Sequence, residues 1–302
     1  MYHHRAFEVQ LDEGSSLRYE APTTTKEAAK LLAKEKGAAY LLAGGTDLLV
    51  RMKGDFIEPD LVVDIKRIAS TQSIQKTATG FTVGASVPCV QVGRDKALGK
   101  AWPGVVEAAK LIGSDQVQGR CTMAGNMCNA SPAADSVPAL VAARAKAVVV
   151  GPNGKRSVPV EKMATGPGAT TLKKGELVEA IKLPKQDSKS GDAYLRFTPR
   201  TEMDIAVCSA AVNLTLGAGG VVKKARIALG AVAPTVVIVP AAAKAIVGSK
   251  LDDTALEKLA KACEAACNPI DDKRGTAEFR TEVAGVLARR AAKIAYQRAG
   301  GK

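Results

Sequence analysis

Histidine is nearly absent from this chain of 302 residues: only His3 and His4 occur, side by side near the N-terminus. This scarcity excludes most histidine-dependent chemistry, including Ser-His-Asp and Cys-His nucleophiles and the usual zinc sites. We therefore predict no catalytic residue and no metal ligand. If the chain takes part in an enzyme, we expect the chemistry to reside in a cofactor.

The six cysteines do not form a metal motif. None of them makes a CxxC pair, and Cys263 and Cys267 lie four residues apart in an alanine-rich, helix-like stretch. These two could share a helix face, but two thiols without further ligands make a poor metal site. We interpret the cysteines as small buried apolar residues in a reducing compartment.

Aromatic residues are also scarce, at 4% of the chain, so stacking platforms for bases are few. The net charge of +13 nevertheless raises nucleic-acid binding as a rival function, with salt-sensitive DNA binding as its sign. The basic residues are spread along the chain without a dense tract, which favours a lysine-decorated surface and no nucleic-acid partner. Binding to an acidic partner subunit or to an anionic cofactor would also account for the positive net charge.

Long apolar runs are missing too. No segment approaches the roughly 18 consecutive apolar residues of a membrane span. The polar start of the sequence, residues 1–5, lacks the apolar core of a signal peptide. We expect no transmembrane segment and a cytoplasmic location.

The predicted elements indicate an α+β protein. Strands at residues 7–11 and 39–42 flank a helix that follows Pro22, is capped by Thr24 with Glu27 three residues on, and ends at Gly37. Further strands are expected at 61–65, 72–77, 80–85, 145–150, 156–160 and 177–183, with helices at 103–112 and 137–143. After a polar linker at 185–192 come strands at 193–197, 205–216 and 221–229 and helices at 240–247, 253–267 and 278–298.

Residues 43–49 form the first candidate site. They read Ala-Gly-Gly-Thr-Asp-Leu-Leu and follow an apolar run, an order that predicts a strand, a glycine turn and a helix. Two adjacent glycines let a bulky group approach the backbone, and the helix start directs free N–H groups into the same space. An anion such as a phosphate is the natural occupant. Most such glycine pairs, however, are ordinary turns.

A second segment, residues 120–135, consists almost entirely of small or amide-bearing side chains. It is expected to be a long ordered loop between two helices, in which another molecule fills the volume. Asn126 and Asn129 can donate or accept hydrogen bonds, and Asp135 suits the hydroxyl groups of a ribityl or ribose chain. A tightly packed connection between helices is the alternative.

The two segments together resemble the FAD-binding subunit of the molybdenum hydroxylases, the family of xanthine dehydrogenase, aldehyde oxidase and aerobic carbon monoxide dehydrogenase. The similarity covers essentially the whole chain and is carried by residues 43–48, 122–126, 130–135, 175–184, 200–206 and 227–234. It implies a two-lobed FAD-binding domain at residues 1–186, with lobes at about 1–58 and 59–186. A C-terminal domain of antiparallel sheet and helices is implied at residues 193–302.

By position, the resemblance places the FAD pyrophosphate between the two glycine segments. The residues it assigns to the cofactor are Leu41, Leu42, Ala43, Gly44, Gly45, Thr46, Asp47, Leu48, Thr122, Met123, Ala124, Gly125, Asn126, Asp135 and Arg196. Backbone N–H groups and an Asn side chain suit a doubly charged pyrophosphate and require no catalytic histidine.

The sequence departs from the family pattern at several positions. Ala124 replaces the first of two usual glycines, which is tolerable where φ is negative and unfavourable otherwise. Gln118-Gly119 replaces a common Arg-Asn pair, although Arg120 follows. No cysteine-rich insertion occurs, so we predict no iron–sulfur cluster in this chain. Thr46-Asp47 stands where the carbon monoxide branch typically has His-Ser, which weakly disfavours carbon monoxide and leaves aldehydes, purines and N-heteroaromatics open.

The resemblance implies a flavoprotein subunit of an oxidoreductase complex. Substrate is expected to be oxidised at a molybdopterin cofactor in a large partner subunit. Electrons then pass through two 2Fe–2S clusters in a small partner subunit to FAD in this chain, and on to an external acceptor. A dimer of such heterotrimers is expected. The alternative is a non-catalytic scaffold subunit that has lost FAD, and a flavin absorption spectrum separates the two.

Overall fold

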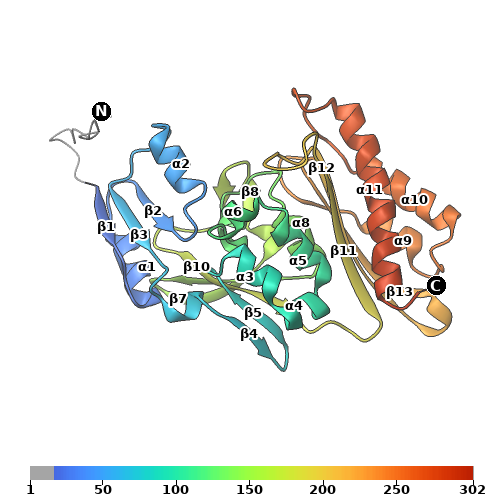
Figure 1. The fold of residues 1–302 in the computed structure, drawn as a ribbon, viewed down its shortest axis with the longest axis horizontal. Coiled ribbons are helices and arrows are strands. Elements are labelled where there is room, and N and C mark those ends of the chain that lie inside the picture. The colour runs from blue at the N-terminus through green and yellow to red at the C-terminus, as the bar shows by residue number, and fades with distance from the viewer. Residues whose placement is uncertain (1–16, 302) are drawn as a thin grey trace, which may run out of the picture.

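A small parallel sheet forms one end of the computed structural model, which describes residues 17–301 (Figure 1). Its strands are β1 (Arg18–Glu20), β2 (Ala39–Leu42) and β3 (Leu61–Asp64), and its helices are α1 (Thr25–Lys34) and α2 (Leu48–Lys53). Strand β3 is central and pairs in parallel with both neighbours. In sequence order the sheet ends with β3, close to the expected boundary of the first lobe at about residue 58. The strand predicted at residues 7–11 lies outside the described residues.

Helix α1 begins where the sequence predicts, and its cap is confirmed. The Thr24 hydroxyl accepts a hydrogen bond from Glu27 N at 3.2 Å, which satisfies one free N–H group of the first turn. The helix ends before Gly37, however. Its end is set by Glu35, whose carboxylate accepts from the backbone N–H groups of Lys36 and Gly37 and so competes with another helical turn.

A five-stranded antiparallel sheet follows, in the order β4-β5-β10-β6-β7. Its strands are β4 (Ile74–Thr77), β5 (Gly80–Gly84), β6 (Lys146–Gly151), β7 (Gly154–Pro159) and β10 (Leu177–Pro184). The predicted hairpin of β6 and β7 is confirmed, with Gly151 paired to Gly154 across a two-residue turn. Around this sheet lie α3 (Cys89–Arg94), α4 (Lys96–Ala101), α5 (Pro103–Lys110), α6 (Asp115–Gln118), α7 (Met123–Cys128), α8 (Ser136–Ala142) and the small pair β8 (Ala164–Gly166) and β9 (Ala169–Thr170).

The last third of the chain forms a four-stranded antiparallel sheet with helices on both faces (Figure 1). Its elements are β11 (Ser190–Phe197), β12 (Cys208–Leu216), β13 (Val222–Gly230), β14 (Val237–Ile238), α9 (Pro240–Ile246), α10 (Asp253–Glu264) and α11 (Ala277–Arg298). Strand residues alternate between the faces. Ala210 and Val212 pack with the C-terminal helices, whereas Ala211 joins the core that contains α5 and α8. The predicted α+β class is confirmed, and helices of the earlier segments help to cover this sheet.

Strand β11 begins at Ser190, inside the segment predicted to be a linker. The Ser190 and Thr215 hydroxyls hydrogen-bond across the sheet at 2.7 Å. Gly191 has no room for a side chain, because a Cβ there would lie 2.7 Å from Ala299 N and would overlap the last turn of α11. Ser190 therefore takes part in strand pairing and Gly191 in close packing against α11, although serine and glycine are typical of loops.

Asp192 joins the two parts of the chain at this point. Its carboxylate, on a residue with only 3% exposure, accepts a hydrogen bond from Val105 N in the first turn of α5 at 3.2 Å. Arg298 donates to the Asp192 backbone carbonyl at 2.8 Å and also pairs with Glu107. Burial raises the pKa of Asp192 from 3.8 to about 7, with Arg298 opposing and Glu107 adding to the increase.

This raised pKa predicts a stability that falls as pH rises. Between about pH 4 and about pH 7 the folded chain keeps the Asp192 proton and the unfolded chain has lost it, so each pH unit costs at most about 1.4 kcal/mol. Above about pH 7 both states have lost the Asp192 proton, and the free energy of unfolding no longer falls because of this group. Asp192→Asn should show no such decline, and unfolding followed by the fluorescence of the single tryptophan, Trp102, would compare the two. Stability curves that run parallel from about pH 5 to about pH 8 would contradict the assignment.

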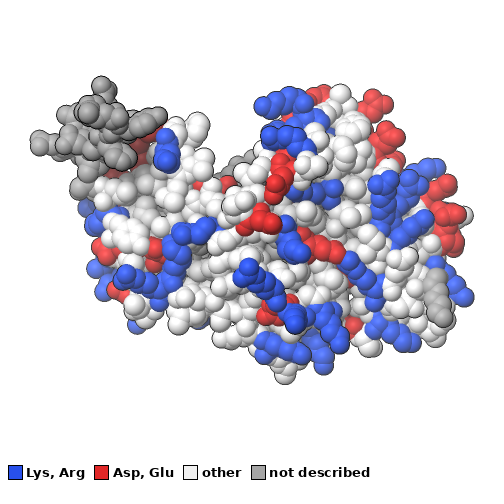
Figure 2. Space-filling model, viewed as in Figure 1, with Lys and Arg blue, Asp and Glu red and all other residues white. Residues whose placement is uncertain are grey.

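Charged side chains are spread over the outer surface. Figure 2 shows Lys and Arg from the first lobe to the C-terminal helices, with Asp and Glu among them. On this face the positive charge is therefore dispersed, as the sequence predicts. Within residues 17–301, no helix has both the length and the apolar character that a membrane crossing needs.

Candidate cofactor site

The first glycine segment forms a tight turn between β2 and α2, in the predicted order of strand, turn and helix. Gly45 has φ +78°, the left-handed region that favours glycine, and a Cβ there would lie 2.9 Å from Leu42. The consecutive N–H groups from Gly44 to Leu48 donate to no acceptor in the described part of the chain. Free N–H groups on such a turn are suited to an anion.

Gly44 brings the first segment into contact with the second. A Cβ at this position would overlap the Arg120 carbonyl oxygen and lie 2.9 Å from Cys121 Cα. Only glycine therefore lets the two backbones approach this closely. In the sequence, the glycines are interpreted as leaving room for a bound group. In the structure, Gly44 also allows the two segments to pack against each other.

The second segment differs from the long loop that the sequence predicts, because it contains the short helix α7, and another short helix, α6, lies just before it. Each begins at a capping hydroxyl. Ser114 Oγ accepts from Val117 N at 3.4 Å, and Thr122 Oγ1 accepts from Gly125 N at 2.9 Å. Gly125 and Asn126 have low helix propensity, and helices of four and six residues are too short to show a full hydrophobic period, which hides them from a sequence pattern.

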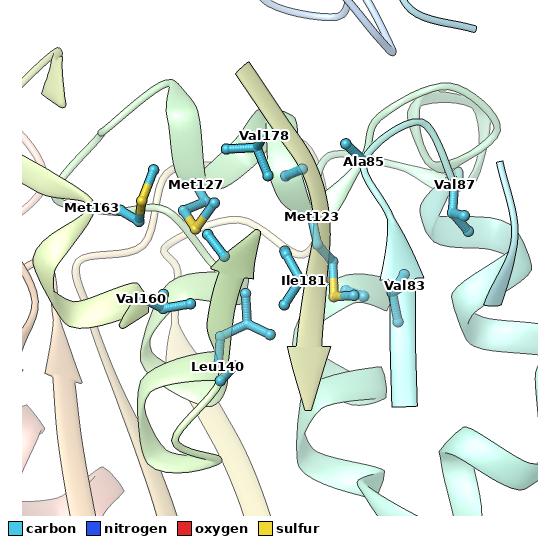
Figure 3. Close-up of a cluster of buried hydrophobic side chains, with 14 of the residues drawn as sticks. Val83, Ala85, Val87, Met123, Met127, Leu140, Val160, Met163, Val178 and Ile181 are labelled. Atoms are coloured by element: carbon cyan, nitrogen blue, oxygen red, sulfur yellow. The ribbon is translucent and has the colours of Figure 1, made fainter. Parts of the chain in front are cut away.

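Two methionines fix the orientation of α7. Met123 and Met127 are one turn apart on the same helix face and are 2% and 1% exposed. Figure 3 shows both within the cluster of buried side chains formed with β5 and β10. Gly125 and Asn126 lie on the side of the helix that lines the cavity described below.

Ala124 occupies a backbone conformation that alanine tolerates. It is the second residue of α7, and it is not among the residues with positive φ in the described chain. The condition that the sequence analysis sets for an alanine at this position is therefore met.

Amide side chains of the second segment hold the neighbouring elements together. Asn129 Nδ2 donates to Asp47 Oδ1 at 3.2 Å and so links the two glycine segments. Asn126 Oδ1 accepts from both Ser136 N, at 3.0 Å, and Ser136 Oγ, at 2.7 Å, which ties α7 to α8. Partial removal from water raises the pKa of Asp47, and the nearby Arg51 opposes this effect.

A cavity of about 470 Å³ lies between the two segments, within the range of about 300–1,000 Å³ typical of small-molecule sites. Of the residues predicted at the cofactor, those that line it are Leu41, Ala43, Gly44, Gly45, Thr46, Asp47, Leu48, Thr122, Ala124, Gly125 and Asn126. Leu42 and Met123 are instead buried in the protein. The two segments, far apart in sequence, thus meet around one cavity.

Several lining residues were not predicted. Arg51 adds a positive charge one helical turn after Asp47, and this i, i+4 spacing could have indicated it. The apolar walls are Tyr40, Ile65, Ala85, Ile112 and Val178, which come from both sheets and the end of α5. Because these residues are ordinary core positions in the sequence, no local signal identifies them.

Asp135 and Arg196, the other predicted cofactor contacts, form an ion pair outside the cavity lining. Arg196 Nη1 lies 2.8 Å from Asp135 Oδ2, and both side chains are nearly buried, at 6% and 11% exposure. The Tyr194 hydroxyl donates to Asp135 Oδ1 at 3.2 Å. Burial raises the pKa of Asp135, and the Arg196 charge opposes this increase. Asp135, Arg196 and Tyr194 thus join α8 to β11. The contact of Asp135 and Arg196 with the cofactor stays a prediction.

The site offers the groups that FAD binding needs. Residues with free backbone N–H groups, together with Arg51, line one cavity that also has apolar walls, and this combination suits a pyrophosphate attached to flat ring systems. Within residues 17–301, no three His, Cys, Asp or Glu side chains gather where they could hold a metal ion.

Comparison with known families gives two matches that together span most of the chain. Residues 14–186 match the FAD binding domain in molybdopterin dehydrogenase. Residues 193–295 match the CO dehydrogenase flavoprotein C-terminal domain.

Individual proteins are similar over nearly their whole length. The carbon monoxide dehydrogenase medium chain of Hydrogenophaga pseudoflava is 33% identical over 288 residues, covering 93% of this chain and 97% of that protein. The xanthine dehydrogenase FAD-binding subunit of Escherichia coli O157:H7 is 29% identical over 286 residues, covering 94% and 97%.

Solved structures share the fold. A carbon monoxide dehydrogenase chain from H. pseudoflava superposes with a TM-score of 0.89 at 34% identity, covering 93% of this chain and 98% of that chain. A chain of quinoline 2-oxidoreductase from Pseudomonas putida 86 gives a TM-score of 0.87 at 25% identity, covering 94% and 98%.

Proposed function

The chain belongs to the family of FAD-binding medium subunits of the molybdenum hydroxylases, and from this premise we propose that the cavity between the two glycine segments holds its FAD. Membership confirms the resemblance seen in the sequence and makes the chain an oxidoreductase subunit. The observation that carries the proposal is the contact of Gly44 with Arg120 and Cys121, which assembles both segments around one cavity.

The pyrophosphate is assigned to the N–H groups of residues 44–48 and to Arg51. These donors belong to a turn that Gly45 and the hydrogen bond between Asp47 and Asn129 hold in place, so they are fixed before the ligand arrives. The ring systems are assigned to the apolar walls, where Tyr40 and Val178 face the same cavity.

When bound, FAD supplies two-electron and one-electron transfer, and this chain supplies binding and orientation. We further propose that the electrons come from two 2Fe–2S clusters in a small partner subunit and leave to an external acceptor. Substrate would be oxidised at a molybdopterin cofactor in a large partner subunit. The name medium chain, borne by similar proteins, supports partners of other sizes, and we propose a dimer of heterotrimers in the cytoplasm.

The proposed division of the chain is an FAD-binding domain at residues 1–186 and a C-terminal domain at 193–302. It is supported by the separate matches to residues 14–186 and 193–295 and by separate hydrophobic clusters. The substrate is left open, because similar chains belong to enzymes named for carbon monoxide, xanthine, nicotine and caffeine.

The rival function is a scaffold subunit without flavin. Its support in the sequence is Ala124 and the Gln118-Gly119 pair. In the structure Ala124 sits within a helix, and Gln118 Nε2 donates to the Lys110 carbonyl at 2.6 Å, a packing role that needs no cofactor. The observed geometry therefore favours the flavoprotein.

Flavin binding by the full chain tests the proposal. The purified chain, or the complex it copurifies with, should show flavin absorption or should gain it when titrated with FAD. If neither takes up FAD at micromolar concentration, the proposed function fails and the scaffold reading stands.

Arg51→Ala should weaken FAD binding by roughly 10- to 100-fold, because a charged hydrogen bond to phosphate contributes about 1.5–3 kcal/mol. Lys53→Ala is the matched control: it removes one positive charge from the same helix, at a residue outside the cavity lining. Its FAD affinity should stay close to that of the unmodified chain. Equal losses in the two variants would mean that general charge, rather than a contact in the cavity, attracts the ligand.

A further inference from the structure

Two cysteines from separate segments lie side by side next to the cavity. Pro88 and Thr122 form an isolated antiparallel bridge, and Cys89 N donates to the Cys121 carbonyl at 2.8 Å. Cys89 and Cys121 are therefore opposite one another. Residues opposite one another in antiparallel pairing have Cα atoms about 4.5–5.5 Å apart, within the range of about 4.4–6.8 Å that disulfides span.

The two thiols interact and are unequal. A hydrogen bond from the Cys89 thiol lowers the pKa of Cys121 and raises that of Cys89. Cys89 is fully buried, whereas Cys121 contributes to the cavity lining. Both residues are therefore buried in the protein, with Cys121, at 3% exposure, in the cavity wall and Cys89 without exposed surface. Both are free thiols in the structure.

We propose that Cys89 and Cys121 form a redox-sensitive pair, which a peroxide entering the cavity converts to a disulfide. The pairing depends only on the contact between the two segments. It is therefore independent of the proposed function, and a chain that binds no flavin should still form this bond.

The chemistry balances with hydrogen peroxide as the oxidant. The Cys121 thiolate attacks one peroxide oxygen, the O–O bond breaks, and a sulfenic acid forms at Cys121 with release of hydroxide. The Cys89 sulfur then attacks the Cys121 sulfur, and the sulfenic hydroxyl leaves as water with the Cys89 proton. Two thiols are oxidised by two electrons, one peroxide is reduced, and two waters result.

Cys128 provides an internal comparison. It lines the same cavity and is less buried than Cys121, but loss of hydration raises the pKa of its thiol to about 12. A thiolate is the reactive form, and Cys121 lies opposite a second thiol, Cys89, so the link should form at Cys121. Access to the cavity alone does not select Cys121, since both residues have it.

The experiment treats the full chain with a small excess of hydrogen peroxide, blocks the remaining thiols and maps the unreduced peptides by mass spectrometry. We expect one linked peptide, joining Cys89 to Cys121, and loss of two hydrogen atoms from the intact mass. Cys89→Ser should prevent the link and leave a sulfenic acid at Cys121, which a dimedone probe traps. Cys128→Ser should leave the yield of the link unchanged.

Two results would overturn the proposal. One is a folded wild-type chain in which no link between Cys89 and Cys121 forms while other cysteines become oxidised. The other is loss of the link in Cys128→Ser, which would assign the reaction to a different pair. Adding FAD before peroxide gives a further readout: a ligand that covers Cys121 should slow the link by roughly tenfold or more, whereas failure to bind FAD would leave the rate unchanged and count only against the proposed function.

Discussion

Replacing Gly44 with valine should reduce FAD affinity by roughly a hundredfold or more, the loss expected when two charged hydrogen bonds are misplaced. The new side chain would overlap the Arg120 carbonyl and press on Cys121, so the first segment must move away from the second. The displaced N–H groups then no longer converge on the cavity. Overpacking of this kind should also lower the free energy of unfolding by about 1–3 kcal/mol. FAD titration and urea unfolding measure the two effects.

Gly99→Ala is the control for this result. Gly99 lies in α4, and a Cβ there meets no atom within 4 Å. Alanine is the better helix former, so stability should rise by up to about 1 kcal/mol. FAD affinity should not change. Normal FAD binding in Gly44→Val would show that the contact between the segments does not shape the site.

Replacing Arg196 with methionine should destabilise the chain by about 3–5 kcal/mol, because it leaves the Asp135 carboxylate buried without its partner. The pair joins α8 to β11, so the loss should appear as weaker attachment of the C-terminal sheet. It should be larger at about pH 8 than at about pH 5. The pKa of Asp135 is already raised by burial and would rise further without Arg196, so at lower pH the folded variant can keep that carboxyl protonated.

Lys224→Met is the matched control, since its ion pair with Asp187 is more than half exposed on both sides. It should leave stability unchanged, as water and salt screen exposed pairs. Adding Asp135→Asn to Arg196→Met should recover part of the lost stability. If the single Arg196 variant unfolds at the same denaturant concentration as the unmodified chain, the buried pair does not hold these elements together.

Local signals account for the elements that could be predicted. The Thr24 cap, the turn between β6 and β7, and the amphipathic helix α10 each depend on residues a few positions apart. Helix α7 escaped prediction although two local signals exist: a Thr122 cap and methionines at i and i+4. Its glycine and asparagine content outweighed both.

The assembled site could be predicted only as far as the family resemblance reached. Arg196 pairs with a residue 61 positions away, and Gly44 lies against the backbone of Arg120. Such contacts depend on how the sheets are placed, which no short pattern encodes. The same holds for Asp192, which composition assigns to a linker but which the fold buries against α5.

The sheet that carries α5 and α8 on one face has a consequence for synthesis of the chain. Those two helices leave the ribosome well before strands β11 to β13, whose Ala211 and Ala228 complete their packing. At about 5–20 residues per second, the apolar side chains of α5 and α8 that pack on this sheet stay uncovered for several seconds. During this interval the nascent protein is most open to aggregation, and a chaperone that binds apolar helices would act on it then.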